Sequence, residues 1–273
     1  MQLIWKRFSI LLAFAMTAAI ALALSPTASA QQYGDKEYSP SMGQEGKDVI
    51  WVPTPNELIA KMLDMAKLTA SDIHFDLGSG DGRTVIAAAK RGANATGVEF
   101  NPDMVALSNR SAQREGVTAK VKFIHGDIFQ TDFSKATVLT LYLLPSLNLK
   151  LRPTILNMKP GTRVVSHAFT MGDWQADQTE TVEGRTAYLW IVPAKVGGNW
   201  RVDGSGDLVL KQTFQKIEGS AGGKPISNAT LRGDTISFSA DGRDYSGKVN
   251  VDHIEGTLKT SGKDTKWSAT RSK

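Results

Sequence analysis

The residues best suited to chemistry lie in a glycine-rich segment, residues 75–83, with the sequence Phe-Asp-Leu-Gly-Ser-Gly-Asp-Gly-Arg. A strand-like run precedes this segment and a helix-like run, residues 84–90, follows it. Gly78, Gly80 and Gly82 lack the Cβ atoms that would hold the backbone away from a ligand, and they permit the positive φ angles of a tight turn. The helix offers free N–H groups at its first turn. The segment therefore predicts a site for a nucleoside-like ligand.

The spacing of these glycines argues against a dinucleotide cofactor. The dinucleotide pattern G-x-G-x-x-G requires a glycine at the position of Arg83, whereas the third glycine here is Gly82. Counted from Asp76, the pattern is instead D-x-G-x-G-x-G, with Ser79 between the first two glycines. The alternative interpretation is an ordinary strand-to-helix turn without a ligand.

Two carboxylates follow further strand-like runs. Glu99 lies near the end of the run 95–100, at the distance downstream where an acidic side chain can accept hydrogen bonds from ribose hydroxyls. Asp127 follows the run 121–125, and with its apolar neighbour Ile128 it can pair with and pack on an adenine. The alternatives are that Glu99 is a solvated strand end and that Asp127 is a turn residue after Gly126.

Capping signals mark the helices that must position these side chains. Thr54 and Glu57 can form a capping box around Pro55 at the start of one helix. Asn101 can cap a second helix, with Pro102 at its first position. An apolar run at 136–144, of strand length, carries Tyr142 near its end. Strands and helices alternate up to about residue 193, which indicates an α/β fold.

Residues 49–193 resemble the class I S-adenosylmethionine (SAM) dependent methyltransferases, whose first motif is D-x-G-x-G-x-G. The resemblance implies a Rossmann-like sheet with helices on both faces, SAM as the cofactor, and direct methyl transfer, which is mainly a task of positioning. The resemblance also places Tyr142 and Pro145 at the fourth motif of the family, which borders the methyl acceptor. Tyr142 is therefore the candidate catalytic residue. The alternative is that Tyr142 is an aromatic residue of the core. The implied cofactor-binding residues are Asp76, Gly78, Ser79, Gly80, Gly82, Glu99, Asp127 and Ile128.

Within this class the chain is similar to a bacterial group related to the lysine methyltransferases of the ATP synthase c subunit. The narrower similarity rests on residues 51–55, 76–83 and 141–145. Other amine methylators carry an N-P-P-Y motif with Asn or Asp against the target nitrogen, whereas this chain has Leu141 and Tyr142. The expected acceptor is therefore a protein lysine or a small molecule. His74 and His167 lie in strand-like runs and are expected to be structural, although His167 lies near a strand end that could face the site.

Composition and charge narrow the classes of partner and ligand. The net charge of +5 falls by two, to +3, if Lys6 and Arg7 are removed with the N-terminal segment. We find no basic stripe with interleaved aromatic residues, so nucleic acid is not expected as a partner. The chain has four His and no Cys, and no spacing typical of metal ligands, so no metal site is predicted.

The N-terminus predicts export. Lys6 and Arg7 precede the apolar residues 8–24, and Ala28-Ser29-Ala30 fits a small-x-small cleavage site, so residues 1–30 are expected to be a signal peptide. The mature protein would be periplasmic or secreted; an uncleaved membrane anchor is the alternative. Residues 31–47 are polar and predict a flexible leader before a SAM-binding domain at 48–194. Because SAM is made in the cytoplasm, the alternative function is an exported nucleoside-binding or envelope interaction protein without turnover.

Residues 199–273 have a different pattern. Short alternating runs are separated by turn residues, and the stretch is bracketed by Trp200 and Trp267. This predicts a small antiparallel β domain, a barrel or a sandwich, joined by a linker at 196–199. The domain is expected either to recognise an envelope partner or to be a stabilising appendage.

Overall fold

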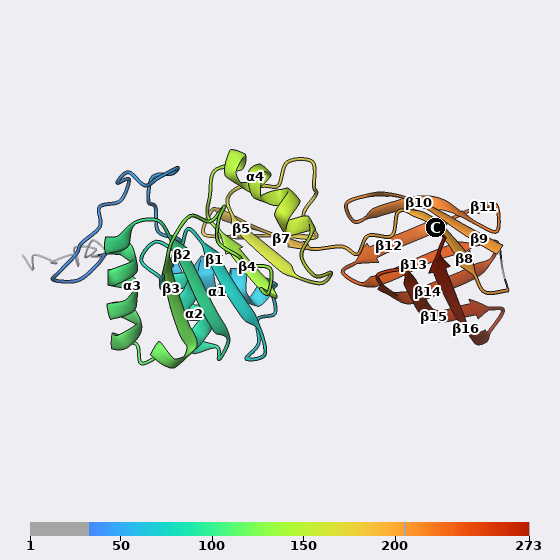
Figure 1. Ribbon diagram of the computed structural model, residues 1–273, viewed down its shortest axis with the longest axis horizontal. Coiled ribbons are helices and arrows are strands. Elements are labelled where there is room, and N and C mark those ends of the chain that lie inside the picture. Colours follow the sequence, from blue (N-terminus) through green and yellow to red (C-terminus); the bar gives the residue numbers. More distant parts are fainter. Residues whose placement is uncertain (1–32, 205, 273) are drawn as a thin grey trace, which may run out of the picture. The chain divides into compact units, whose positions relative to one another are not determined.

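The computed structural model describes residues 33–204 and 206–272, in which two β-sheets and four α-helices are formed (Figure 1). The predicted signal peptide, residues 1–30, lies outside the described residues. Within the part of the chain that is described, no helix is long and apolar enough to cross a membrane.

The first sheet has seven strands in the order β3-β2-β1-β4-β5-β7-β6. The five strands from β3 to β5 are parallel to one another, and β7 is antiparallel to both β5 and β6. This topology confirms the predicted Rossmann-like sheet. The strands are β1 (Ile73–Leu77), β2 (Asn94–Glu99), β3 (Val121–His125), β4 (Val138–Leu141), β5 (Arg163–His167), β6 (Gln178–Val182) and β7 (Arg185–Ile191).

Helices cover both faces of this sheet, as predicted. Alternate strand residues point to opposite faces: Val138 packs against α1, whereas Leu139 packs in the cluster that contains residues of α4. Helix α2 packs beside α1. The helices are α1 (Asn56–Met65), α2 (Arg83–Lys90), α3 (Pro102–Arg114) and α4 (Pro145–Leu156), with a 3-10 turn η1 (Thr118–Lys120) before β3.

Of the two predicted helix caps, one is confirmed and one is wrong. The side chain of Asn101 accepts hydrogen bonds from the backbone N–H groups of Asp103 and Met104, with Pro102 at the first position of α3. At α1 the N-cap is Pro55 and no side chain caps the helix. The hydroxyl of Thr54 instead lies 3.1 Å from Nδ1 of His167, because this side chain is buried against the end of β5.

The fourth strand is shorter than its apolar run predicts. Only Val138–Leu141 pairs with its neighbours, and Pro145 begins α4. Residues 142–144 therefore connect the strand to the helix at the carboxyl edge of the sheet, and the apolar run 136–144 is not one continuous strand.

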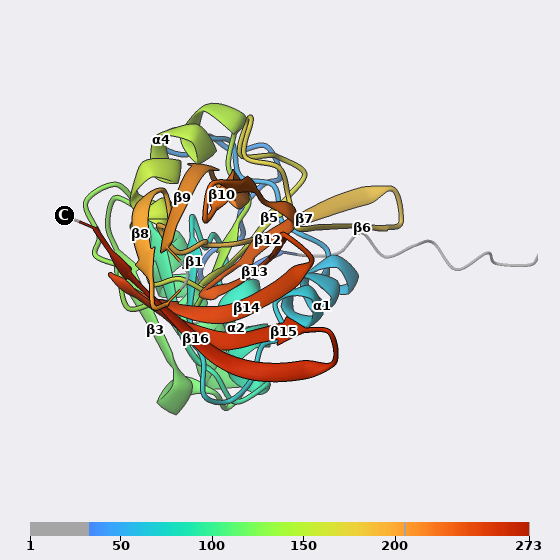
Figure 2. The same cartoon turned by 90° about the vertical axis from the view of Figure 1, so that its right-hand side faces the viewer.

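The second sheet is entirely antiparallel and has nine strands in the order β11-β10-β9-β8-β16-β15-β14-β13-β12. It curves strongly (Figure 2), and β10 and β12 approach each other, so the domain is nearly a closed barrel. Trp200 and Trp267 are both buried inside it. The strands are β8 (Gly198–Val202), β9 (Gly206–Thr213), β10 (Lys216–Ala221), β11 (Lys224–Pro225), β12 (Ser227–Arg232), β13 (Thr235–Ala240), β14 (Arg243–Asn250), β15 (His253–Thr260) and β16 (Lys263–Arg271).

This sheet confirms the predicted small antiparallel β domain. Val196, in the predicted linker, is already buried in the core of this sheet. The division of the chain into two independently folding domains stays a prediction, and a close backbone contact in the second sheet offers a way to test it.

Gly256 of β15 lies opposite Gly247 of β14. A Cβ atom on Gly256 would lie 1.8 Å from the carbonyl oxygen of Ser246 and 2.5 Å from Cα of Gly247. We therefore expect Gly256→Ala to force β14 and β15 apart and to lower the free energy of unfolding of the second sheet by about 1–3 kcal/mol. Scanning calorimetry should show one transition at a lower temperature and a second one, from the first sheet, unchanged.

Gly197→Ala is the matched control, because a Cβ atom there would have its nearest neighbour at an ordinary 3.5 Å. A single transition that moves as a whole in Gly256→Ala would contradict the division into two domains.

Candidate functional site

A cavity of about 280 Å³ lies at the carboxyl edge of the first sheet. The parallel strands β1, β2, β3 and β4 all end at this edge, where ligands of open α/β sheets bind. The structure thus brings together residues that the sequence spreads over four strands. Those that line the cavity are Asp76, Gly78, Ser79, Gly80, Glu99, Asp127, Ile128 and Tyr142. Their contact with a cofactor stays a prediction.

The carboxylate of Glu99 holds two loops of the site in place. Its Oε2 accepts a hydrogen bond from the backbone N–H of Gly80 at 2.8 Å, and its Oε1 accepts one from the N–H of Asn101 at 2.9 Å. Glu99 therefore joins the glycine-rich turn to the start of α3. Each carboxylate oxygen has a second lone pair, which leaves room for hydrogen bonds from ribose hydroxyls.

Gly82 is the one predicted cofactor residue that is not among those lining the cavity. It is the N-cap of α2, with a φ of 79°. A Cβ atom there would lie 2.7 Å from the hydroxyl oxygen of Ser108 and 2.8 Å from the ring of Phe123. Gly82 thus allows the start of α2 to pack closely on α3 and β3.

Asp76 belongs to a buried chain of polar groups. The hydroxyl of Thr140 lies 2.6 Å from Oδ1 of Asp76 and 2.8 Å from Nε2 of His74. When Asp76 is ionised, Thr140 donates its only proton to the carboxylate, so Nε2 of His74 must donate to Thr140. Burial raises the pKa of Asp76 to about 7 and lowers the pKa of His74 to about 3. His74 is therefore a neutral, hydrogen-bonded structural residue, as expected.

Asp127 is held by a residue that the sequence analysis did not connect with the site. Its Oδ1 accepts the backbone N–H of Phe129 at 2.8 Å, and its Oδ2 lies 3.1 Å from Nζ of Lys47. These donors lower the pKa of Asp127 and keep it ionised. Its neighbour Ile128 is buried in the core under the sheet edge. No local signal could have found Lys47, because it lies in the polar segment before the first helix.

Aromatic rings form the wall of the cavity on the side of β4 and β5. The ring of Tyr142 lies on the imidazole of His167, with centroids 3.8 Å apart, and it stacks on Phe169 at 6.1 Å. His167 in turn is fixed by Thr54. Burial lowers the pKa of His167 to about 4, so the imidazole is neutral at physiological pH. Tyr142 is half-buried and lines the cavity, and its catalytic role stays a prediction.

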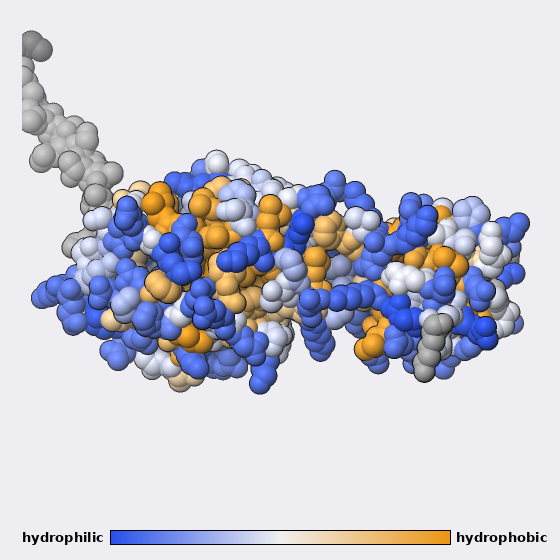
Figure 3. All heavy atoms as spheres, turned by 45° about the horizontal axis from the view of Figure 1, so that its top comes forward, coloured by the Kyte–Doolittle hydropathy of each residue, from blue (hydrophilic) through white to orange (hydrophobic). Residues whose placement is uncertain are grey.

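Apolar side chains also surround the mouth of the cavity. Ile50 and Leu144 line it and are 59% and 43% exposed. The face of the molecule that carries α4 shows several apolar areas among its charged side chains (Figure 3).

Comparisons with known proteins agree with this geometry. A family model described as the ANTKMT methyltransferase domain matches residues 76–178, which end before the second sheet begins. A protein-lysine N-methyltransferase of Saccharolobus islandicus is 39% identical over 151 residues, which cover 53% of this chain and 94% of that protein. The human lysine N-methyltransferase of the ATP synthase c subunit is 34% identical over 135 residues, which cover 49% of this chain but only 57% of that protein.

Among solved structures, an RNA methyltransferase from Salinibacter ruber in complex with S-adenosylhomocysteine is 48% identical to this chain. It matches with a TM-score of 0.52 over 53% of this chain and 96% of that one. Its bound ligand is the demethylated product of SAM, which fits the nucleoside site predicted from the glycine-rich turn.

The raised pKa of Asp76 gives a testable pH dependence. S-Adenosylhomocysteine carries an α-ammonium group, and a carboxylate attracts it only when ionised, which for Asp76 means above a pH of about 7. We expect the affinity for S-adenosylhomocysteine to rise between about pH 6 and 8 and to fall at higher pH, as the ammonium loses its proton. At pH 6 Asp76 is mostly protonated, so it must release its proton when the ammonium binds. Titration calorimetry in two buffers should detect this proton release.

In Asp76→Asn the affinity for S-adenosylhomocysteine should not rise with pH. The control is Asp132→Asn, at an exposed aspartate outside the cavity, where the affinity should rise as in the wild type. An unchanged profile in Asp76→Asn would remove Asp76 from the ammonium end of the site.

Proposed function

The chain belongs to the family of SAM-dependent protein-lysine N-methyltransferases, and from this premise we propose that it methylates the side-chain amine of a lysine in a protein. The observation that carries the proposal is the similarity to the protein-lysine N-methyltransferase of Saccharolobus islandicus, which is 39% identical and is matched over 94% of its length. The cavity supports it, because it gathers predicted site residues at one edge of the sheet. The alternative, an exported nucleoside-binding or envelope interaction protein without turnover, is not favoured by this family membership.

The residues that line the cavity divide into groups for the parts of the cofactor. Asp76, beneath the glycine-rich turn, suits the ammonium of the methionine part, and Glu99 suits the ribose hydroxyls. Asp127 and Ile128 suit the adenine. When bound, SAM supplies a methyl group that its sulfonium already activates, so the protein needs only to align the acceptor and exclude water.

Tyr142, Phe169 and Leu144 form an apolar and aromatic wall that can hold the aliphatic stem of a lysine side chain. The amine at the end of that stem must lose its proton before it attacks, because only the neutral form has a free lone pair. We assign the hydroxyl of Tyr142 to accept a hydrogen bond from the amine and thereby orient its lone pair. His167 acts through Tyr142 as a positioning residue, because its imidazole contacts the Tyr142 ring with centroids 3.8 Å apart.

A methylation assay with labelled SAM tests this assignment. The acceptors are a protein extract, RNA, and a lysine peptide with its Lys→Arg counterpart. We expect label on protein lysine, with a rate that rises about tenfold per pH unit below the pKa of the amine. Tyr142→Phe should lower kcat by roughly tenfold or more, whereas Tyr188→Phe, which does not line the cavity, should leave it unchanged.

Label that enters RNA and not protein would contradict a lysine acceptor, and so would a rate that does not change with pH. Binding of SAM without labelling of any acceptor would support the alternative without turnover.

We further propose that the protein is exported, on the pattern of residues 1–30, and that the second sheet serves an envelope partner. Intact-mass analysis of the protein from its own cell envelope should give a mature chain that begins at Gln31. A mass that still includes Met1, in the membrane fraction, would indicate an uncleaved anchor instead.

A further inference from the structure

Residues 33–51, which we call the strap, precede α1, and their second half contributes to the lining of the cavity. The second half of the strap is a small hairpin: the N–H of Gly43 donates to the carbonyl of Trp51 at 2.8 Å, and the N–H of Trp51 donates to Gln44 at 2.9 Å. Residues 44–51 all line the cavity. The second half of the strap is therefore part of the cavity wall, although the sequence predicts a flexible leader over residues 31–47.

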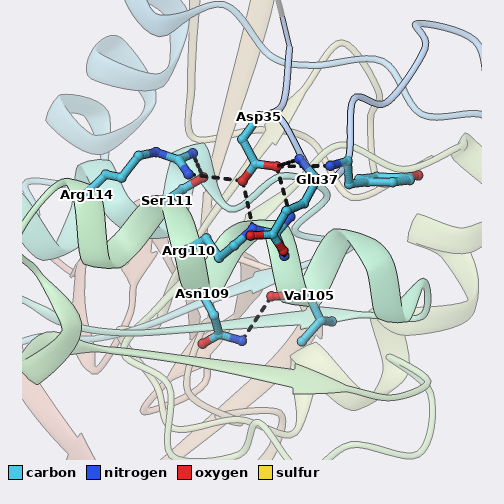
Figure 4. A network of polar contacts seen from close by, with 8 residues as sticks. Asp35, Glu37, Val105, Asn109, Arg110, Ser111 and Arg114 are labelled. Atoms are coloured by element: carbon cyan, nitrogen blue, oxygen red, sulfur yellow. Dashed lines mark hydrogen bonds and ion pairs between the residues drawn. The ribbon is translucent and has the colours of Figure 1, made fainter.

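The first half of the strap is fastened to α3 by Asp35 (Figure 4). Its carboxylate accepts two hydrogen bonds from Arg110, at 2.7 and 3.0 Å, and one from Arg114 at 3.0 Å. The backbone N–H groups of Glu37 and Tyr38 also donate to it. These donors, Arg110 foremost, hold the pKa of Asp35 well below its usual range. A bidentate arginine pair is the strongest ordinary form of ion pair.

The strap also packs directly on the glycine-rich turn. The indole of Trp51 lies so close to Gly80 that a Cβ atom on Gly80 would be 2.6 Å from Nε1 of Trp51. Tyr33 meets Trp51 edge to face, with ring centroids 5.4 Å apart, and the guanidinium of Arg83 lies 5.0 Å from the centroid of the Tyr33 ring. The loop that is expected to approach the cofactor is thus in direct contact with the strap.

The hairpin tip reaches the opposite end of the cavity. Nζ of Lys47 lies 3.1 Å from Asp127, 3.0 Å from Asp48 and 5.4 Å from the centroid of the Phe100 ring. The Lys47 and Asp127 side chains are 33% and 16% exposed. A single, partly exposed pair of this kind is weak. The Lys47 end is thus joined to Asp127 by one ion pair, whereas Asp35 is joined to α3 by two arginines.

We propose that the strap retains the cofactor: SAM and its product enter and leave when the Lys47 end lifts from Asp127, and Asp35 is the positioning residue that keeps the strap across the cavity. The proposal rests on the proposed function, because it takes the cavity to be the SAM site. The predicted cleavage after Ala30 would leave the whole strap in the mature chain.

The test compares rates of S-adenosylhomocysteine release, measured by stopped-flow displacement, in the mature chain. We expect Asp35→Asn to release the ligand at least about fivefold faster, because changes at a closing contact act mainly on dissociation. Arg110→Gln should act in the same direction but less strongly, because Arg114 still pairs with Asp35, and the double variant should release the ligand no faster than Asp35→Asn alone. Circular dichroism should show the same folded state in all of them.

The matched control is Asp64→Asn, which removes an ion pair with Arg91 at 2.7 Å, between α1 and the end of α2 and outside the cavity. It should release the ligand at the wild-type rate. Raising the salt concentration should speed release in the wild type, because salt weakens exposed ion pairs. It should have little effect in Asp35→Asn combined with Lys47→Met, since this double variant lacks the ion pairs at both ends of the strap.

Wild-type release rates in Asp35→Asn and Arg110→Gln would overturn the strap proposal and leave the proposed function intact. A folded wild-type chain that binds no S-adenosylhomocysteine would instead contradict the proposed function itself, so the two failures are distinguishable.

Discussion

The site depends on one carboxylate that holds two backbone loops together. Glu99 accepts the N–H of Gly80 on one side and the N–H of Asn101 on the other, and so fixes the glycine-rich turn relative to the first residue before α3. Because β1 and β2 are parallel neighbours in register, their carboxyl ends lie side by side, and a short side chain can reach both loops. The same helix α3 carries Arg110 and Arg114, which hold the strap. The glycine-rich turn and the strap, which both contribute residues to the cavity lining, are thus connected through Glu99 and α3.

Much of the first sheet and its site could be predicted from the sequence, because the signals are local. The glycines after Asp76 specify a tight turn, and Asn101 with Pro102 specifies the start of a helix. The carboxyl ends of parallel strands meet at one edge, which brings Glu99 and Asp127 to the same cavity. These features need no knowledge of distant contacts.

Contacts between distant segments could not be predicted. Thr54 has the sequence context of a capping box, yet it is bound to His167, 113 residues away, because burial at the sheet edge offers it a stronger partner. Asp35 and Lys47 lie in a polar stretch that resembles a flexible leader by composition alone. In the second sheet, strands such as β12 and β16 are rich in polar residues, so their alternation is weak. The apolar Val251 lies in a turn, with a φ of 51°.

The most direct test is a calorimetric titration of the protein with SAM. The account predicts one SAM per chain, and an affinity at least about tenfold weaker in Glu99→Ala, because the loss of this carboxylate leaves two loop N–H groups and the ribose without their acceptor. Glu218→Ala, at an exposed position of the second sheet, should bind as the wild type does. A folded wild-type chain that binds no SAM, or a Glu99→Ala variant that binds SAM with unchanged affinity, would contradict it.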